Sequence, residues 1–167
     1  MYKKVLAMVG VLLLSGLVFA EESGKDYSII LDEREKKLVF EQCSRMTPTF
    51  RSNYRDLSNE VVEKIEQMLP DAVNKAAKGK SVNIDDYYRQ YVAFEILRRE
   101  FVYVNAFNKA DVMRRAKGQP AYGEQFGNWE SKAVNVCGGE MAYWGVIYDN
   151  ETETIAEVLF NTRAKTD

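Results

Sequence analysis

Residues 85–116 read DDYYRQYVAFEILRREFVYVNAFNKADVMRRA, and this stretch decides the fold that we expect. Apolar residues recur along it at spacings of three and four, which is typical of an α-helix. One row consists of Tyr87, Tyr91, Phe94, Leu97, Phe101 and Val104, and a second row consists of Tyr88, Val92, Ile96 and Tyr103. A helix that is apolar over so much of its circumference has to be covered on more than one side. We therefore predict a long central helix over residues 85–116, with Glu95 and Arg99 as an i,i+4 ion pair.

Two further helices are expected on the N-terminal side of this stretch. Apolar and charged residues from Tyr27 to Met46 predict a first helix, which ends before Pro48 because a residue that precedes proline avoids the helical conformation. Pro48 is well placed as the first residue of a second helix, which Pro70 is expected to kink or end. The single apolar stripe of this second helix consists of Phe50, Tyr54, Leu57, Val61, Ile65 and Met68.

After Gly118 the sequence changes character. Glycine, proline and aromatic residues are interspersed over residues 118–130, which indicates an ordered loop with aromatic anchors. Two runs with high strand propensity follow, at residues 132–137 and 140–149. The Gly138-Gly139 pair between them is typical of a two-residue hairpin turn, because that turn needs positive φ angles.

A second reversal after Asp149 is expected to return the chain as a third strand over residues 154–162. The alternative is a last helix over residues 155–165, because Thr154 and Glu157 fit a capping box. The fold class that we predict is α+β: three N-terminal helices, the third long and central, packed on a small C-terminal antiparallel β-meander. An all-α fold is the alternative.

The first twenty residues have the pattern of a signal peptide. Two lysines precede a mostly apolar run of about 15 residues, and the small residue Ala20 precedes two glutamates. The run is shorter than the roughly 20 residues that a membrane span needs. We therefore expect cleavage after Ala20, no stable membrane insertion, and a single mature domain over residues 21–167 that works in the periplasm or the secreted fraction.

The mature chain is acidic. The leader holds two of the 23 Lys and Arg residues and none of the 25 Asp and Glu residues, which leaves a net charge of −4. Nucleic acids and anionic membranes attract a concentrated positive field. We expect neither as a partner.

The two cysteines, Cys43 and Cys137, are predicted to form a disulfide. An isolated pair in an oxidising compartment is usually bonded, and a loop of this length is worth roughly 4 kcal/mol in the chain-entropy model. The alternative is a pair of free buried thiols. A catalytic thiol is disfavoured because the chain contains no histidine to activate it.

The absence of histidine narrows the possible chemistry. It removes Ser-His-Asp and Cys-His nucleophilic sites, the common catalytic zinc sets and histidine-ligated haem. Ser-x-x-Lys, phosphate-binding and dinucleotide motifs are absent as well. We expect no metal site and no cofactor, and the sequence carries no recognisable catalytic motif.

Carboxylate chemistry remains open. A glycan-cleaving enzyme needs one or two acidic residues in a cleft, at least one of them with a pKa raised by apolar surroundings. Glu140, beside an apolar and aromatic run, is the first candidate, and Glu95 is the second. The competing interpretation is that Glu140 flanks a solvated turn and that Glu95 pairs with Arg99.

Aromatic residues gather in the last third of the chain. We take Trp129, Tyr143, Trp144 and Tyr148 as candidate binding residues, because aromatic side chains are enriched at protein interfaces. The competing interpretation is that they cover the core. A small sheet has two faces, and both carry apolar residues here. If the helices pack on one face, the other is free for a partner.

The function that these features favour is an exported binding protein of the bacterial envelope, which captures another protein as an inhibitor or toxin-neutralising partner. The alternatives are a carboxylate-dependent enzyme that cleaves cell-wall glycan and a carrier of small apolar ligands. The sequence does not determine the oligomeric state.

Overall fold

The computed structural model describes residues 25–118 and 126–162. The predicted leader and part of the loop expected over residues 118–130 lie outside the described residues. Within them the chain forms three α-helices and one six-stranded mixed sheet. In chain order the elements are β1 (Tyr27–Ile29), α1 (Glu33–Val39), β2 (Tyr54–Arg55), α2 (Asn59–Ala76), η1 (Ile84–Asp86), β3 (Tyr87–Ile96), β4 (Arg99–Asn108), α3 (Lys109–Gly118), η2 (Glu140–Ala142), β5 (Tyr143–Asp149) and β6 (Thr154–Phe160).

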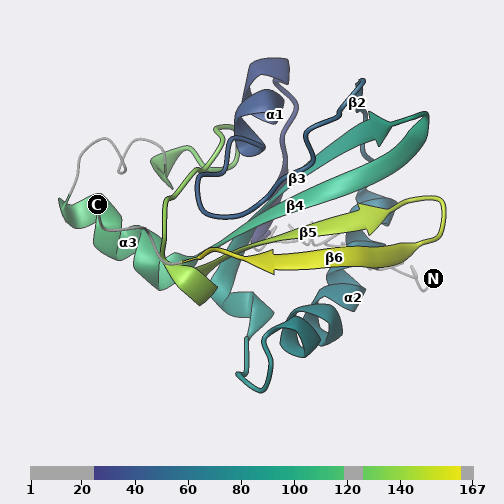
Figure 1. The fold of residues 1–167 in the computed structure, drawn as a ribbon. Helices are drawn as coiled ribbons and strands as arrows, with labels where there is room; N and C mark the ends of the chain where they lie inside the picture. The colour runs from purple at the N-terminus through teal and green to yellow at the C-terminus, as the bar shows by residue number, and fades with distance from the viewer. Residues whose placement is uncertain (1–24, 119–125, 163–167) are drawn as a thin grey trace, which may run out of the picture.

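The sheet has the strand order β1-β3-β4-β5-β6, and β2 pairs with a second part of β3. Strands β3 to β6 form an antiparallel meander, whereas β1 runs parallel to β3. The two short strands β1 and β2 share one edge of the sheet, so that β3 is covered along much of its length. The opposite edge is β6, which lies at the front of Figure 1.

The long central helix predicted over residues 85–116 is wrong, because this stretch forms the β3–β4 hairpin and only its end belongs to α3. A strand that is buried on both faces carries apolar residues at odd and even positions alike. Its pattern then resembles that of a helix with two apolar rows. The sequence also lacks the usual signal for the hairpin turn. It consists of Leu97 and Arg98, with φ angles of 50° and 70°, where glycine or asparagine would be usual.

The arrangement of helices first and meander last is also wrong. A strand precedes the first helix, and α1 covers only seven residues. Helix α2 begins at Asn59, where Ser58 caps it, eleven residues later than the sequence indicates. The helix then continues through Pro70, whose side chain lies on the exposed side of the helix. Of the two effects predicted for this proline, a kink or an end of the helix, the end is therefore wrong.

The C-terminal part differs from the expectation in one strand. Residues 143–149 and 154–160 are strands, so the helix considered for residues 155–165 and the all-α alternative are excluded. Residues 132–137 are not a strand; they cross the sheet as an irregular segment. Gly138 and Gly139, with φ angles of 73° and 82°, lead this segment into η2 rather than into a hairpin partner.

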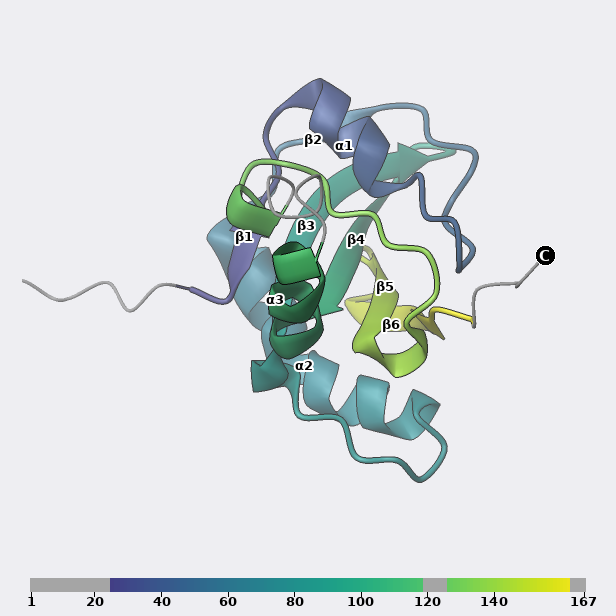
Figure 2. The ribbon, with the colours of Figure 1, turned by 90° about the vertical axis from the view of Figure 1, so that its left-hand side faces the viewer.

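The sheet lies between two layers. Helix α2 covers one face, and α1 with the segment after residue 126 covers the other (Figures 1 and 2). The core under α2 contains Ile65, Leu69, Val104, Trp144 and Val146, and the core under α1 contains Val39, Phe40, Val92, Phe94 and Tyr103. None of the helices in residues 25–118 and 126–162 has the length and hydropathy of a membrane span.

The predicted disulfide is confirmed. The Sγ atoms of Cys43 and Cys137 are 2.04 Å apart. The bond attaches the irregular segment to the end of the α1 region, and next to it Ser44 Oγ accepts a hydrogen bond from the Gly138 amide at 2.6 Å. A structural disulfide fits a compartment outside the reducing cytoplasm.

Candidate binding surface

Glu140 and Glu95, the two carboxylates predicted as catalytic candidates, do not form a catalytic pair. Glu95 lies near the end of β3 that pairs with β2, and its carboxylate accepts hydrogen bonds from Asn53 Nδ2 at 2.8 Å and Arg55 Nε at 2.7 Å. These two partners lower the pKa of Glu95. A general acid needs a raised pKa, so the surroundings of Glu95 favour the ionised form. The predicted pairing of Glu95 with Arg99 is replaced by the ion pair with Arg55.

Glu140 lies at the other end of the sheet. It opens the short turn η2, is exposed, and has a φ angle of 47°. The strand β5 that follows it begins opposite Phe107 of β4, whereas Glu95 lies opposite Glu100 at the start of β4. The two candidates therefore do not share a cleft. The solvated-turn interpretation describes the position of Glu140.

The predicted aromatic binding residues lie mainly inside the fold. Tyr143, Trp144 and Tyr148 have exposed fractions of 2%, 0% and 1%. Trp129 is half-buried and stacks on Tyr88, with 4.5 Å between the ring centroids. A partner could not reach the three buried rings without opening the core, so an accessible surface has to be sought elsewhere.

Strand β6 offers such a surface, because within residues 25–118 and 126–162 it pairs with β5 on one side only. The amide of Asn161 donates to the Tyr143 carbonyl at 2.9 Å, and this bond shows which residues of β6 direct their N–H and C=O groups towards β5. Along an antiparallel pair such positions alternate, so residues 157 and 159 also face β5. The N–H and C=O groups of Val158 and Phe160 point away from the sheet. Just beyond them the Thr162 amide donates to Ser44 O at 2.8 Å and closes that end of the edge.

A groove runs between β6 and α2. It is open and has a volume of about 730 Å³. The floor and the strand side carry Ile155, Ala156 and Val158, and the helix side carries Met68, Asp71, Ala72, Lys75 and Ala76. The groove therefore combines the backbone edge of β6 with a helix wall on which small or flexible apolar side chains alternate with the polar groups of Gln67, Asp71 and Lys75.

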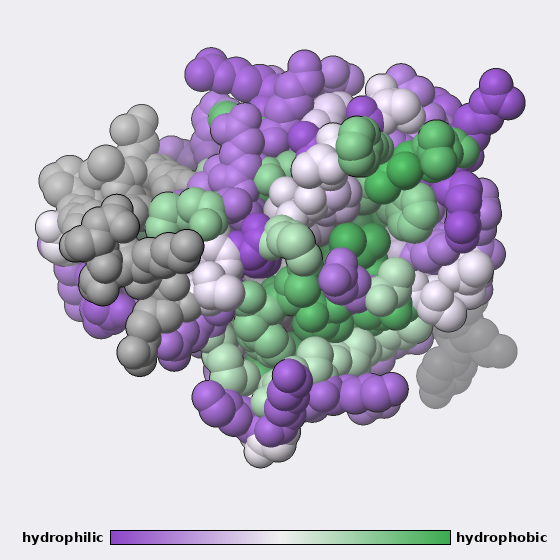
Figure 3. Space-filling view, in the orientation of Figure 1, coloured by the Kyte–Doolittle hydropathy of each residue, from purple (hydrophilic) through white to green (hydrophobic). Residues whose placement is uncertain are grey.

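The opposite face of β6 is also partly apolar. Leu159, whose partner on β5 is Gly145, and Ile147, whose partner on β6 is Glu157, are half-buried. Figure 3, which has the orientation of Figure 1, shows apolar residues gathered over the β5–β6 side of the molecule and polar residues around them. We call residues 154–160 together with Ile147 and the groove the β6 surface. Contiguous exposed apolar patches with a polar rim are typical of protein interaction sites.

Glu157 is the one charged side chain that β6 contributes to this surface. It is exposed, and it forms no hydrogen bond or ion pair with any other described residue. Glu157 lies between half-buried Val158 and the bulge at Ala156, where the register against β5 shifts. Its carboxylate, which pairs with no described residue, therefore lies beside apolar side chains.

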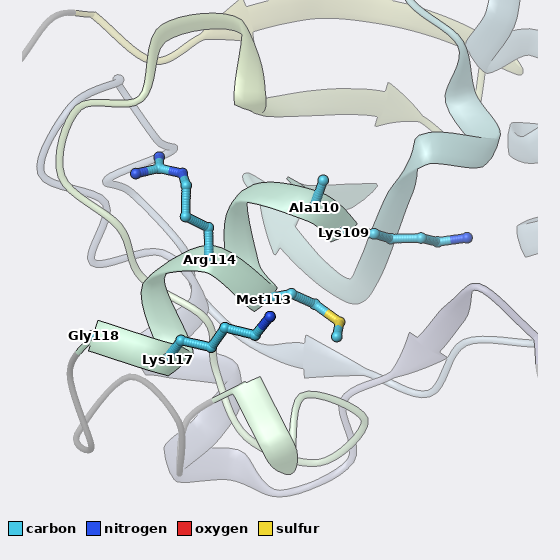
Figure 4. Close-up of a pocket in the computed structure, with 6 residues that line it drawn as sticks. All are labelled: Lys109, Ala110, Met113, Arg114, Lys117 and Gly118. Carbon is cyan, nitrogen blue, oxygen red and sulfur yellow. The ribbon is translucent and has the colours of Figure 1, made fainter.

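A second depression, of about 830 Å³, lies on α3 (Figure 4). Its cations are largely compensated within the fold, since Lys109 pairs with Asp26 at 2.6 Å and Arg114 pairs with Asp111. Met113 is exposed there beside Lys117. Among the described residues only α3 lines this depression, and it offers no strand edge, so we regard it as the weaker candidate. Among residues 25–118 and 126–162, no group of three potential metal ligands exists.

Comparison of the chain with models of protein families, with curated proteins and with solved structures finds no match. Sequence reasoning missed the β6 surface because the exposure of a strand edge depends on sheet order. The only sequence signal was the expected strand over residues 154–162, which suggests an edge without showing that it is free.

Proposed function

We propose that the chain is an exported protein of the bacterial envelope that captures another protein through the β6 surface, as an inhibitor or a toxin-neutralising partner does. The observation that carries this proposal is the backbone of Val158 and Phe160, which pairs with no other described residue and lies beside the groove. The leader-like first twenty residues and the disulfide support an extracytoplasmic location. The mature charge of −4 supports a protein partner over a nucleic acid.

The glycan-cleaving alternative receives less support. Its two candidate carboxylates lie at opposite ends of the sheet, and the pKa of one of them, Glu95, is lowered rather than raised. The carrier alternative also receives less support, because both faces of the sheet pack against buried side chains and the groove beside β6 lies on the surface.

Site-specific photo-cross-linking tests the proposal. A photoreactive benzoylphenylalanine replaces Ala156 on β6, and in a matched variant it replaces Lys117 on α3, since both positions are exposed. Each variant is produced with its leader in the cells that make the protein and irradiated there. The proposal predicts an adduct with a different protein from position 156 that disappears when Leu159→Asp is added.

Two outcomes would contradict the proposal. The first is an absence of adducts from position 156 in a variant that is folded and oxidised. The second is an adduct from position 117 alone, which would move the binding site to α3.

A further inference from the structure

Resting on the proposed function, we infer that the partner docks as an extended segment that adds a seventh strand along Ala156–Phe160 and carries a basic residue next to Glu157. In the part of the chain that the structure describes, the sheet has six strands. Strand addition at an open sheet edge takes its affinity from main-chain hydrogen bonds and its specificity from pockets for alternate side chains. The β6 surface has both components.

The main-chain component comes from Val158 and Phe160. Their N–H and C=O groups face away from β5, as the Asn161–Tyr143 and Thr162–Ser44 hydrogen bonds require. An added strand lies about 4.8 Å from its neighbour, which places it along the mouth of the groove. The Thr162–Ser44 contact limits the added strand at one end, so that its pairing is confined to about five residues of β6.

The side-chain component follows from the alternation of a strand. Residues of the segment beside Val158 and Phe160 lie on the α2 side of the sheet, since both of these side chains pack against the core under α2. There the groove wall carries Met68 and the small residues Ala72 and Ala76, which leave room for aliphatic side chains. The alternate residues of the segment lie beside Glu157 and Leu159 on the other face.

The charge component is Glu157. On α2, Asp71 and Lys75 carry opposite charges one turn apart, and Glu157 is the charge that β6 itself presents along the edge. Opposite charges on neighbouring strands stabilise a sheet, and like charges destabilise it. A lysine or arginine is therefore the complementary residue in the segment, at the position beside Glu157.

The same carboxylate disfavours a second copy of this chain as the occupant. Two β6 strands paired antiparallel about Val158 would bring both Glu157 side chains onto one face at diagonal positions, without a cation between them. The bulge at Ala156 shortens the straight part of the edge further. Charged residues and bulges are means by which edge strands avoid pairing with themselves.

The test is a selection from a random decapeptide library on the immobilised, oxidised mature protein, with the Glu157→Lys and Leu159→Asp variants as controls. We expect enriched peptides without proline that alternate apolar residues and carry Lys or Arg at one position. On Glu157→Lys the enriched charge at that position changes to Asp or Glu. On Leu159→Asp enrichment is lost.

The main-chain bonds are tested with the best peptide, methylated at one backbone nitrogen at a time. Methylation of an amide that faces β6 is expected to weaken binding at least about fivefold, because it removes a hydrogen bond worth roughly 1 kcal/mol. Methylation of the neighbouring amides should change binding less than twofold. In NMR spectra the amides of Val158 and Phe160 should shift on binding.

Several results would overturn the inference: no enrichment over Leu159→Asp, apolar residues at helical spacing, a preference that ignores Glu157→Lys, or a mature protein that is dimeric through β6. If position 156 cross-links to another protein in cells while any of these is found, the proposed function stands and strand addition falls. If position 156 gives no adduct, the proposed function itself falls.

Discussion

Arg45 donates a hydrogen bond from Nε to the Tyr103 hydroxyl at 2.9 Å. The same buried guanidinium reaches Asn161 Oδ1 at 2.5 Å and Asn105 Oδ1. Asn161 in turn donates to the carbonyls of Val136 and Gly138, at 2.9 Å and 2.8 Å. This network connects the disulfide region, the middle of the sheet and the end of β6, and it keeps the closed end of the β6 edge in place.

Gly145 is the residue that makes room for this network. A Cβ atom at this position would lie 2.6 Å from the Tyr103 hydroxyl oxygen and 2.9 Å from Arg45 Nε. We expect Gly145→Ala to lower the free energy of unfolding by about 1–3 kcal/mol, as overpacking of a core does. Chemical denaturation measures this change. Gly127→Ala is the control, because a Cβ there meets no described residue within 4 Å, and an equal loss in both variants would show that the network does not constrain residue 145.

Glu95 predicts a pH dependence of stability. Hydrogen bonds from Asn53 and Arg55 lower its pKa in the folded state, so its stabilising contribution is present above the pKa of the unfolded chain and is lost as the pH falls through the folded-state value. Glu95→Gln should therefore be less stable than the parent protein at pH 7, and the difference should shrink below about pH 4. Urea unfolding at a series of pH values measures it. A constant difference down to pH 2 would contradict this role of the carboxylate.

Tyr91 predicts the opposite behaviour at high pH. Burial, followed by the charge of Glu66 and the hydrogen bond to it, raises the pKa of this phenol well above its usual range. A group with a raised folded-state pKa contributes stability below the unfolded pKa, here about 10, and loses it as the pH rises. Absorbance of tyrosinate should therefore develop later in the native protein than in guanidinium. Tyr91→Phe should reduce that lag, and an unchanged titration curve would contradict the assignment.

The disulfide predicts a large loss on reduction. Cys43 and Cys137 are separated by 94 positions in the sequence, and removal of a native disulfide from a small domain typically costs about 2–5 kcal/mol. Thermal unfolding of the Cys43→Ser/Cys137→Ser double variant should show this loss, and reduction of the parent protein should match it. Equal melting temperatures of oxidised and reduced protein would mean that the bond is dispensable for the fold.

The sequence predicted the disulfide and the β5–β6 hairpin better than the centre of the fold. The cysteine pair and the strands around Tyr148 and Val158 follow from local signals, namely an even cysteine count and runs with high strand propensity. The β3–β4 hairpin did not, because both faces of it are buried and its turn at Leu97-Arg98 contains no glycine. The late start of α2 was missed since Phe50 and Tyr54 continue the apolar stripe although they precede the helix.

The candidate site was the least predictable part. Tyr143, Trp144 and Tyr148 attracted attention as large aromatic residues, yet large aromatic residues serve the core as well as interfaces. The residues that form the β6 surface are ordinary in the sequence, and their exposure follows from strand order. An edge is a property of the whole sheet, which a local pattern cannot reveal.

Amide hydrogen exchange of Val158 and Phe160 tests the central claim most directly. It is measured on the mature protein alone and on its complex with the protein cross-linked from position 156. Unpaired edge amides exchange rapidly, and both should become at least about tenfold slower in the complex. Unchanged exchange at these two amides, with new protection confined to α3 or α1, would contradict the β6 surface as the binding site.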